Sequence, residues 1–224
     1  MNRATPGATA TGVTMATGKT ASRDPGYHGQ RHEQQRSTGK GQVALHGVVS
    51  LLDAEHTGRV ERLWDAIARE FDVRGVYSTP FPHFSYHVAA GYDVDRVGAV
   101  LDRAARKMSP LTVRTSGLGI FTGGQPVVYV PVVRDSALTQ FHASVWPVID
   151  AHASATVDYY RPDRWMPHIT LSFGDVDPER LPGIIGYLNS VDLDWEVRID
   201  NLALILDTGT RQELRFRFAF SHAR

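Results

Sequence analysis

One seven-residue pattern occurs twice in the chain, and it constrains the fold more than any other feature. The first copy, PHFSYHV, runs from Pro82 to Val88, and the second, PHITLSF, runs from Pro167 to Phe173. In each copy a proline and a histidine are followed by apolar, hydroxyl, apolar, polar and apolar residues. Such alternation is typical of a strand with one polar and one apolar face. Each copy therefore predicts a strand whose histidine and hydroxyl side chains share a face.

The surroundings of the two copies repeat as well. His83 and His168 are 85 positions apart, and Val113 precedes Val197 by 84. An apolar strand pattern also precedes each histidine by a similar distance. Self-similarity at a fixed period indicates an internal duplication. We therefore predict two copies of a strand–helix–strand–helix–strand unit, in lobes of about 43–122 and 126–221, related by a pseudo-twofold axis.

Hydrophobic periodicity locates the elements of both copies. A helical stripe from Val60 to Phe71 predicts the first helix, and a second runs from Val97 to about Lys107. The expected strands are Val43 to Leu52, His83 to Ala89, Leu111 to Phe121, Val127 to Val133, a strand from His168, Trp195 to Leu206, and Glu213 to Phe220. The remaining helices are Asp135 to Ala151, interrupted or kinked at Pro147, and a short helix capped by Asp177.

Composition limits the partners and the compartment. The 24 basic and 24 acidic residues give a formal net charge of zero, which argues against binding to nucleic acid mainly by counterion release. The absence of cysteine excludes disulfides, thiol catalysis and thiolate metal sites. No apolar run is long enough to cross a bilayer, and the N-terminus lacks the apolar core of a secretion signal. We expect a cytoplasmic protein without a membrane partner.

Residues 1–42 are predicted to be a disordered tail of low complexity. Ala, Thr, Gly, Ser and Gln dominate this segment, so it cannot bury enough apolar surface to offset the entropy of ordering it. The tail is mildly basic, and a nucleic-acid-binding arm is the alternative to a solvated, dispensable segment. The folded domain is expected to span residues 43–222.

A pair of histidine–hydroxyl units on facing strands suits phosphodiester chemistry. One imidazole can take a proton from the nucleophile while the other gives one to the leaving oxygen, since the ordinary pKa of histidine is about 6.5. The hydroxyls of Ser85 and Thr170 can hold the non-bridging phosphate oxygens. His83, His168, Ser85 and Thr170 are therefore the candidate catalytic residues, without a metal. The alternative is that both histidines simply begin matching strands of related halves.

The triplets His83-Phe84-Ser85 and His168-Ile169-Thr170 resemble the H-x-[S/T] motifs of the two-histidine (2H) phosphoesterase superfamily. Within it, the chain is similar to the branch described as 2'-5' RNA ligase or cyclic phosphodiesterase proteins. The resemblance implies an α+β, bilobal fold, with two antiparallel sheets around a central cleft and helices outside. It also implies cofactor-independent cleavage or formation of phosphoester bonds at a 2' position, in 2',3'-cyclic phosphates or 2'-5' linkages.

Four further residues are candidates for binding the substrate. His87 and Ser172 follow the motif hydroxyls and share their predicted face, while Arg164 and Trp165 precede the second motif. Arginine could bind phosphate and the indole could stack on a base; helix capping, packing or solvation are the alternatives. We expect a monomer acting on an RNA end or a small nucleotide, with no stable nucleic-acid complex. A weakly catalytic binding module of the same fold, or the ligase direction, remains an alternative.

Overall fold

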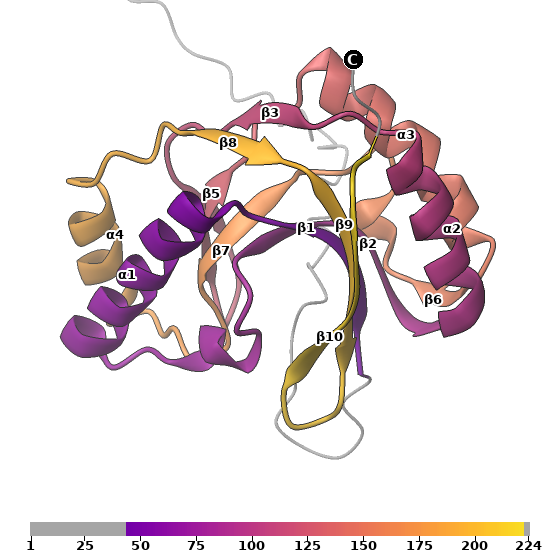
Figure 1. Cartoon of the computed structure of the whole chain (residues 1–224). Coiled ribbons are helices and arrows are strands. Elements are labelled where there is room, and N and C mark those ends of the chain that lie inside the picture. Colours follow the sequence, from indigo (N-terminus) through magenta and orange to yellow (C-terminus); the bar gives the residue numbers. More distant parts are fainter. Residues whose placement is uncertain (1–43, 222–224) are drawn as a thin grey trace, which may run out of the picture. The chain divides into compact units, whose positions relative to one another are not determined.

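The computed structural model describes residues 44–221, which are drawn in colour in Figure 1. The predicted tail, residues 1–42, and residues 43 and 222 of the predicted domain lie outside the described residues. Every strand pairing between the described strands is antiparallel, and helices accompany the sheets. The predicted α+β class with antiparallel sheets is therefore confirmed.

The strands form three sheets in the described part of the chain. The five-stranded sheet has the order β10-β9-β1-β2-β6, and its strands are β1 (His46–Leu51), β2 (His83–Tyr92), β6 (Ala153–Thr156), β9 (Asn201–Asp207) and β10 (Gln212–Ala219). The three-stranded sheet has the order β4-β5-β7, with β4 (Gly119–Phe121), β5 (Val127–Pro131) and β7 (His168–Ser172). A separate pair joins β3 (Leu111–Arg114) to β8 (Glu196–Ile199).

The three longer helices begin at aspartates. They are α1 (Ala54–Phe71), α2 (Val94–Arg106) and α3 (Ser136–Asp150), and a short α4 (Leu181–Leu188) follows. Asp53, Asp93 and Asp135 each accept a hydrogen bond from the backbone N–H three residues on, which satisfies a donor that the first helical turn leaves unpaired. Two 3₁₀ helices complete the fold: η1 (Gly75–Ser78) and η2 (Asp158–Tyr160). None of the helices described here is long and apolar enough to cross a membrane.

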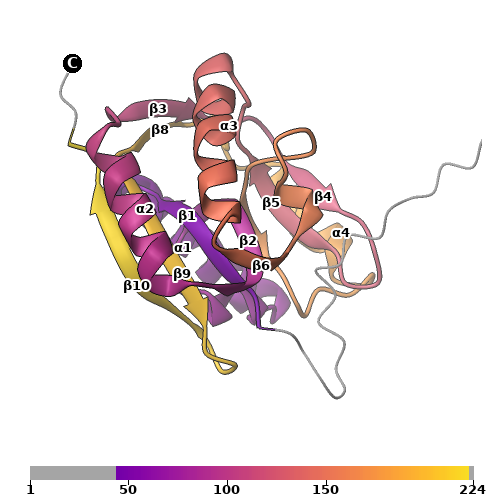
Figure 2. The same ribbon diagram turned by 90° about the vertical axis from the view of Figure 1, so that its right-hand side faces the viewer.

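Two helices, α1 and α3, each pack against strands from the other half of the sequence. α1 follows β1 in the chain but packs against β7, whereas α3 follows β5 and packs against β2 and β6 (Figure 1). Figure 2 shows α2 and α3 over the five-stranded sheet, with β4 and β5 beside it. Each histidine strand is therefore covered by a helix from the other half, so the two halves share one interior.

The structure corrects several sequence predictions. There are three sheets in residues 44–221 instead of two, and the five-stranded sheet draws strands from both predicted lobes. Segments 43–122 and 126–221 therefore do not each build a sheet. The strand predicted over 111–121 breaks after Arg114, where Gly117 has a φ of 66°, and the strand predicted over 195–206 breaks at Asp200. Helix α3 runs on past Pro147, and β6 was not predicted.

Candidate active site

The two histidine motifs begin two neighbouring strands. His83 is the first residue of β2 and His168 the first of β7, and each strand pairs with the strand that precedes it in the repeat, β1 or β5. β2 and β7 belong to different sheets, yet they contact each other. The histidine strands therefore meet where the two sheets adjoin.

Each motif strand has a β-bulge directly after its hydroxyl residue. In β2, Ser85 pairs with Val49 and His87 with Val48, so Tyr86 is the extra residue of the bulge. A bulge inserts one residue into the strand and takes it out of the regular ladder. The register therefore changes between Ser85 and His87.

The second motif repeats this irregularity at the same place. In β7, Thr170 pairs with Tyr129 and Ser172 with Val128, so Leu171 is the extra residue. The strands β3 and β8 pair with Val113 opposite Val197, the two positions that are equivalent in the sequence repeat. Both observations agree with an internal duplication.

The bulges move the residues after them to the other face of each sheet. A strand with one extra residue resumes its alternation out of phase. Accordingly, a Cβ added to Gly47 would contact the side chains of both Ser85 and Val88. Ser85 and Val88 therefore lie on the same face of the sheet, so His87 between them does not. His87 and Ser172 are fully buried. This contradicts the expectation that they share the motif face and contact a substrate.

His87 instead belongs to a packed polar cluster under α3. Its Nε2 lies 3.2 Å from Asp150 Oδ1, and its Nδ1 accepts a hydrogen bond of 2.7 Å from the Tyr92 hydroxyl. Its ring centroid is 5.4 Å from that of Trp146. Burial lowers the pKa of His87, and the Asp150 carboxylate partly opposes that shift. The neutral ring therefore joins β2 to α3.

The ring of His83 is fixed by a hydrogen bond to the backbone just before it. Its Nδ1 lies 2.5 Å from the carbonyl oxygen of Phe81, across Pro82. The surrounding protein lowers the pKa of His83 by burial, and the hydrogen bond to the carbonyl only partly offsets this effect. The side chain nevertheless remains partly exposed. His83 is therefore a neutral imidazole that solvent can still reach.

His168 is held in the same way. Its Nδ1 lies 2.9 Å from the carbonyl oxygen of Met166, across Pro167. The ring is surrounded by aromatic side chains, with centroid distances of 4.9 Å to Phe121, 5.1 Å to Tyr129 and 6.1 Å to Tyr159. The aromatic rings cover most of the imidazole, and the residue is 7% exposed.

These two contacts set the tautomer of both motif histidines. A carbonyl oxygen only accepts hydrogen bonds, so Nδ1 must carry the proton in each ring. The nitrogen that can gain or lose a proton is then Nε2 in His83 and in His168 alike. The same arrangement, with the acceptor two residues earlier across a proline, occurs in both motifs.

The remaining predicted residues differ in exposure. Ser85 and Thr170 are partly exposed on their strands, as a phosphate contact requires. Arg164 is exposed, 3.7 Å from Asp163, and its contact with a substrate stays a prediction. Trp165 is only 1% exposed and stacks on His142 at 3.8 Å, which contradicts the expected stacking on a base because neither face of the indole is open.

Three supporting contacts were not predicted from the sequence. The side chain of Asn201 is buried and bonds both the N–H and the C=O of Leu51, the residue opposite His83. His142 donates from Nε2 to the carbonyl of Tyr86 at 2.8 Å. Trp64, which the helical stripe marked as core, donates its indole N–H to the carbonyl of Thr170. Sequence patterns carry no signal for such contacts, because they join segments far apart in the chain.

The motif histidines have no carboxylate cluster around them that would suit a metal ion. Within residues 44–221, no group of three or more histidine, aspartate or glutamate side chains could hold one. Asp53 and His56 are close together, at 2.8 Å, but they form a helix-capping pair. The neighbours of the motif histidines are instead carbonyl oxygens and aromatic rings.

Comparisons with known proteins place the chain in a family. A family model described as "2'-5' RNA ligase superfamily" matches residues 52–211, whereas a search of curated proteins finds no match. Among solved structures, TT0787 of Thermus thermophilus has a TM-score of 0.57 and 15% identity, covering 80% of this chain and 100% of that chain. This likeness shows a shared fold.

Two further structures are more distantly similar. E. coli LigT complexed with 3'-AMP has a TM-score of 0.49 and 13% identity, covering 81% of this chain and 100% of that chain. Kluyveromyces marxianus Usb1 has a TM-score of 0.44 and 9% identity, covering 80% and 99%. The family model itself spans most of the chain and includes both histidine motifs. The predicted family is thereby confirmed: the chain belongs to the 2'-5' RNA ligase superfamily of 2H phosphoesterases.

Proposed function

We propose that the chain is a metal-independent phosphoesterase that acts on 2',3'-cyclic phosphates or 2'-5' linkages of RNA-derived substrates. One observation carries the proposal: His83 and His168 are oriented in the same way. In each ring, Nδ1–H donates a hydrogen bond to the carbonyl oxygen of the residue two positions earlier. This bond leaves Nε2 as the proton-exchanging atom in both rings. Membership of the superfamily supports the same reaction class.

Hydrolysis of a 2',3'-cyclic phosphate is the specific reaction proposed. A water oxygen attacks phosphorus, one histidine takes the water proton, and the bond from phosphorus to one ribose oxygen breaks. The other histidine gives its proton to that departing oxygen, so a phosphomonoester forms and the two protonation states are exchanged. The hydroxyls of Ser85 and Thr170 donate hydrogen bonds to the non-bridging oxygens, where negative charge develops.

The environment of His83 favours it as the base. Because burial lowers its pKa, this imidazole is neutral at a pH where an ordinary histidine is partly protonated. A neutral Nε2 accepts a proton from water. The acid role then falls to His168, whose Nδ1 is bonded in the same manner.

The competing functions make different predictions for product formation. A binding module of the same fold would bind RNA ends or nucleotides without converting them, and a ligase would join ends into a 2'-5' linkage. A single chain supplies both motifs, so the proposed reaction needs no second copy; the monomeric state stays a prediction.

The test is product analysis on a panel of 2',3'-cyclic nucleotides, RNA ends with cyclic phosphates and 2'-5' dinucleotides. We expect conversion of at least one cyclic phosphate to a monoester, unchanged by EDTA. His83→Ala and His168→Ala should each lower kcat by about 100-fold or more, because each removes a proton-transfer group.

His152→Ala serves as the matched control. His152 is partly exposed and follows α3, and its backbone carbonyl binds the N–H of Asp93, at the end of β2 opposite to His83. Loss of its side chain should therefore leave turnover unchanged. Full activity in either motif variant would contradict the mechanism. Binding without any product would favour the binding module, and accumulation of joined 2'-5' product would favour the ligase direction.

A further inference from the structure

The bulges after the motif hydroxyls expose backbone carbonyls that two tryptophans bind. The indole N–H of Trp165 donates to the carbonyl oxygen of Ser85 at 2.8 Å. The indole N–H of Trp64 donates to the carbonyl oxygen of Thr170 at 3.0 Å. Both acceptors belong to the residue directly before the bulge. The same backbone position is therefore held by an indole in both motifs.

Each indole belongs to a chain segment that is linked to the other motif. Trp165 lies three residues before His168, so its hydrogen bond joins the segment that leads into the second motif to the hydroxyl residue of the first. Trp64 lies in α1, which follows β1, the partner strand of the first motif, and it binds the second motif. The two bonds connect the motif strands in opposite directions across the junction of the sheets.

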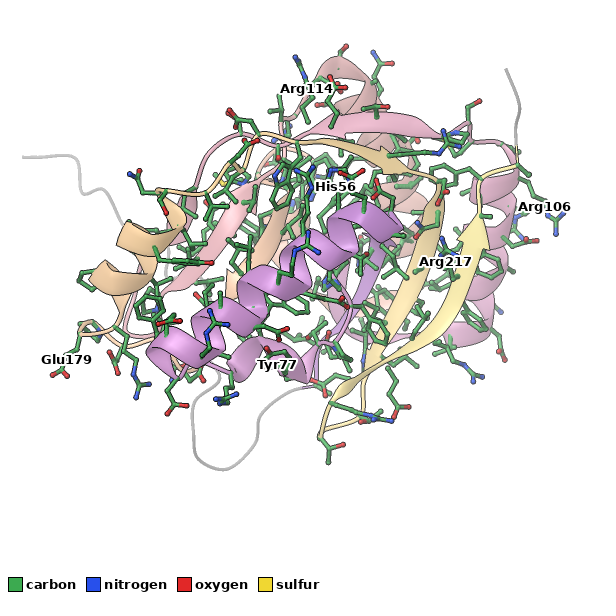
Figure 3. The ribbon with its side chains drawn as sticks, turned by 60° about the vertical axis from the view of Figure 1, so that its left-hand side comes forward. His56, Tyr77, Arg106, Arg114, Glu179 and Arg217 are labelled. Atoms are coloured by element: carbon green, nitrogen blue, oxygen red, sulfur yellow. The ribbon has the colours of Figure 1, made fainter. Side chains whose placement is uncertain are left out.

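The indoles are themselves held in place. Trp165 is 1% exposed, stacks on His142, and its own carbonyl accepts a 2.6 Å hydrogen bond from Arg134. His142 in turn donates to the carbonyl of Tyr86, the bulged residue. Trp64 is 4% exposed and packs edge-to-face with Tyr77 at 6.2 Å; Tyr77 is labelled beside α1 in Figure 3. Such packing leaves the N–H groups little freedom to leave their acceptors.

We propose that Trp165 and Trp64 are positioning residues of the reaction: their indole N–H groups hold the two bulged strands at the separation at which both histidine–hydroxyl pairs can act on one phosphate. This inference rests on the proposed function. A displacement of about 1 Å of a catalytic group can cost on the order of 100-fold in rate. The hydrogen bonds act on the reaction through Ser85 and Thr170, and neither indole touches the substrate.

The test replaces indole N–H donors at three places. Trp165→Phe and Trp64→Phe keep an aromatic ring but lose the donor to a motif strand. Trp195→Phe is the control, because Trp195 is also 4% exposed and its indole N–H donates at 2.9 Å to the backbone carbonyl of Asp192, outside both motif strands. Each variant loses one part-buried indole–carbonyl hydrogen bond, and only the control's bond lies outside the motif strands. The bond of Trp195 is local, so kcat is compared only after correction for the folded fraction of each variant.

We expect kcat to fall by about 10- to 100-fold in Trp165→Phe and in Trp64→Phe while KM changes by less than about twofold, after correction for the folded fraction. Trp195→Phe should retain kcat. Amide hydrogen exchange supplies a second readout that needs no activity: it should become faster in peptides of β2 in Trp165→Phe and of β7 in Trp64→Phe, and change in neither strand in Trp195→Phe.

The outcomes separate this inference from the proposed function. If the wild type is active and both motif-strand variants keep kcat, or the control loses as much, the inference is overturned while the function stands. If the wild type converts no substrate, the proposed function fails, and unchanged exchange in both strands then overturns the inference as well. Should one variant not fold, the other applies the same test to the other strand.

Discussion

Replacement of His142 by glutamine should change how the stability of this protein depends on pH. His142 is 1% exposed, and burial lowers its pKa from 6.5 to about 4, an effect only partly offset by its hydrogen bond to the Tyr86 carbonyl. The unfolded chain therefore binds a proton on His142 at a pH where the folded chain does not. Acid then favours the unfolded state through this residue.

The magnitude follows from the size of the shift. A displacement from 6.5 to about 4 corresponds to about 3 kcal/mol, at about 1.4 kcal/mol per pKa unit. This contribution is complete above pH 6.5, is lost progressively as the pH falls from 6.5 towards 4, and changes no further below 4. Glutamine retains an N–H donor for the Tyr86 carbonyl but does not titrate in this range.

Urea denaturation followed by tryptophan fluorescence at several pH values between about 7 and 4 measures the effect. The free energy of unfolding of His142→Gln should fall less steeply on acidification than that of the wild type. The difference between the two slopes should approach the value for one proton taken up on unfolding. His152→Gln, at a partly exposed position just after α3, is the control and should reproduce the wild-type slope. Identical slopes for the wild type and His142→Gln would refute the reasoning.

Three other predictions follow from the same structure. Because burial lowers the pKa of His83, the acidic limb of kcat/KM should lie below the ordinary histidine value of 6.5, and initial rates that decline already above that pH would contradict its role as the base. Ser172→Ala should leave activity and the urea midpoint nearly unchanged, since the Ser172 hydroxyl is buried without a partner in the described structure; a large loss of kcat would restore it as a substrate contact. Gly75→Ala should lower the free energy of unfolding by about 1–3 kcal/mol, because the added Cβ would collide with the backbone oxygen of Phe173. Gly124→Ala is the control and should stay within about 0.5 kcal/mol of the wild type, because the space around Gly124 is open. Equal urea midpoints for the two variants would show that the loop at Gly75 relaxes.

The sequence was most informative where a local rule decides the structure. Alternation predicted the strands that begin at His83 and His168, and the helical stripe through Trp64 predicted α1. The helix predicted to start at Asp135 is α3, for which Asp135 is the N-cap. These signals depend on neighbours within a few residues, so a single sequence contains them.

Local rules failed where one residue alters the alternation. The pattern placed His87 on the face of His83, but the bulge at Tyr86 shifts the phase by one residue and turns His87 under α3. The same shift at Leu171 buries Ser172. A bulge is set by how a strand fits its partners, and the sequence of the strand alone contained no sign of it.

The sequence by itself therefore determined the two H-x-[S/T] motifs, their spacing, the antiparallel α+β class and the superfamily. Only the tertiary structure decided that α1 covers β7 and α3 covers β2, and that Trp165 is a buried donor to Ser85 instead of a surface for a base. The physical reason is that these contacts join residues tens of positions apart, and their hydrogen-bond partners are backbone atoms, which look the same at every position of a sequence.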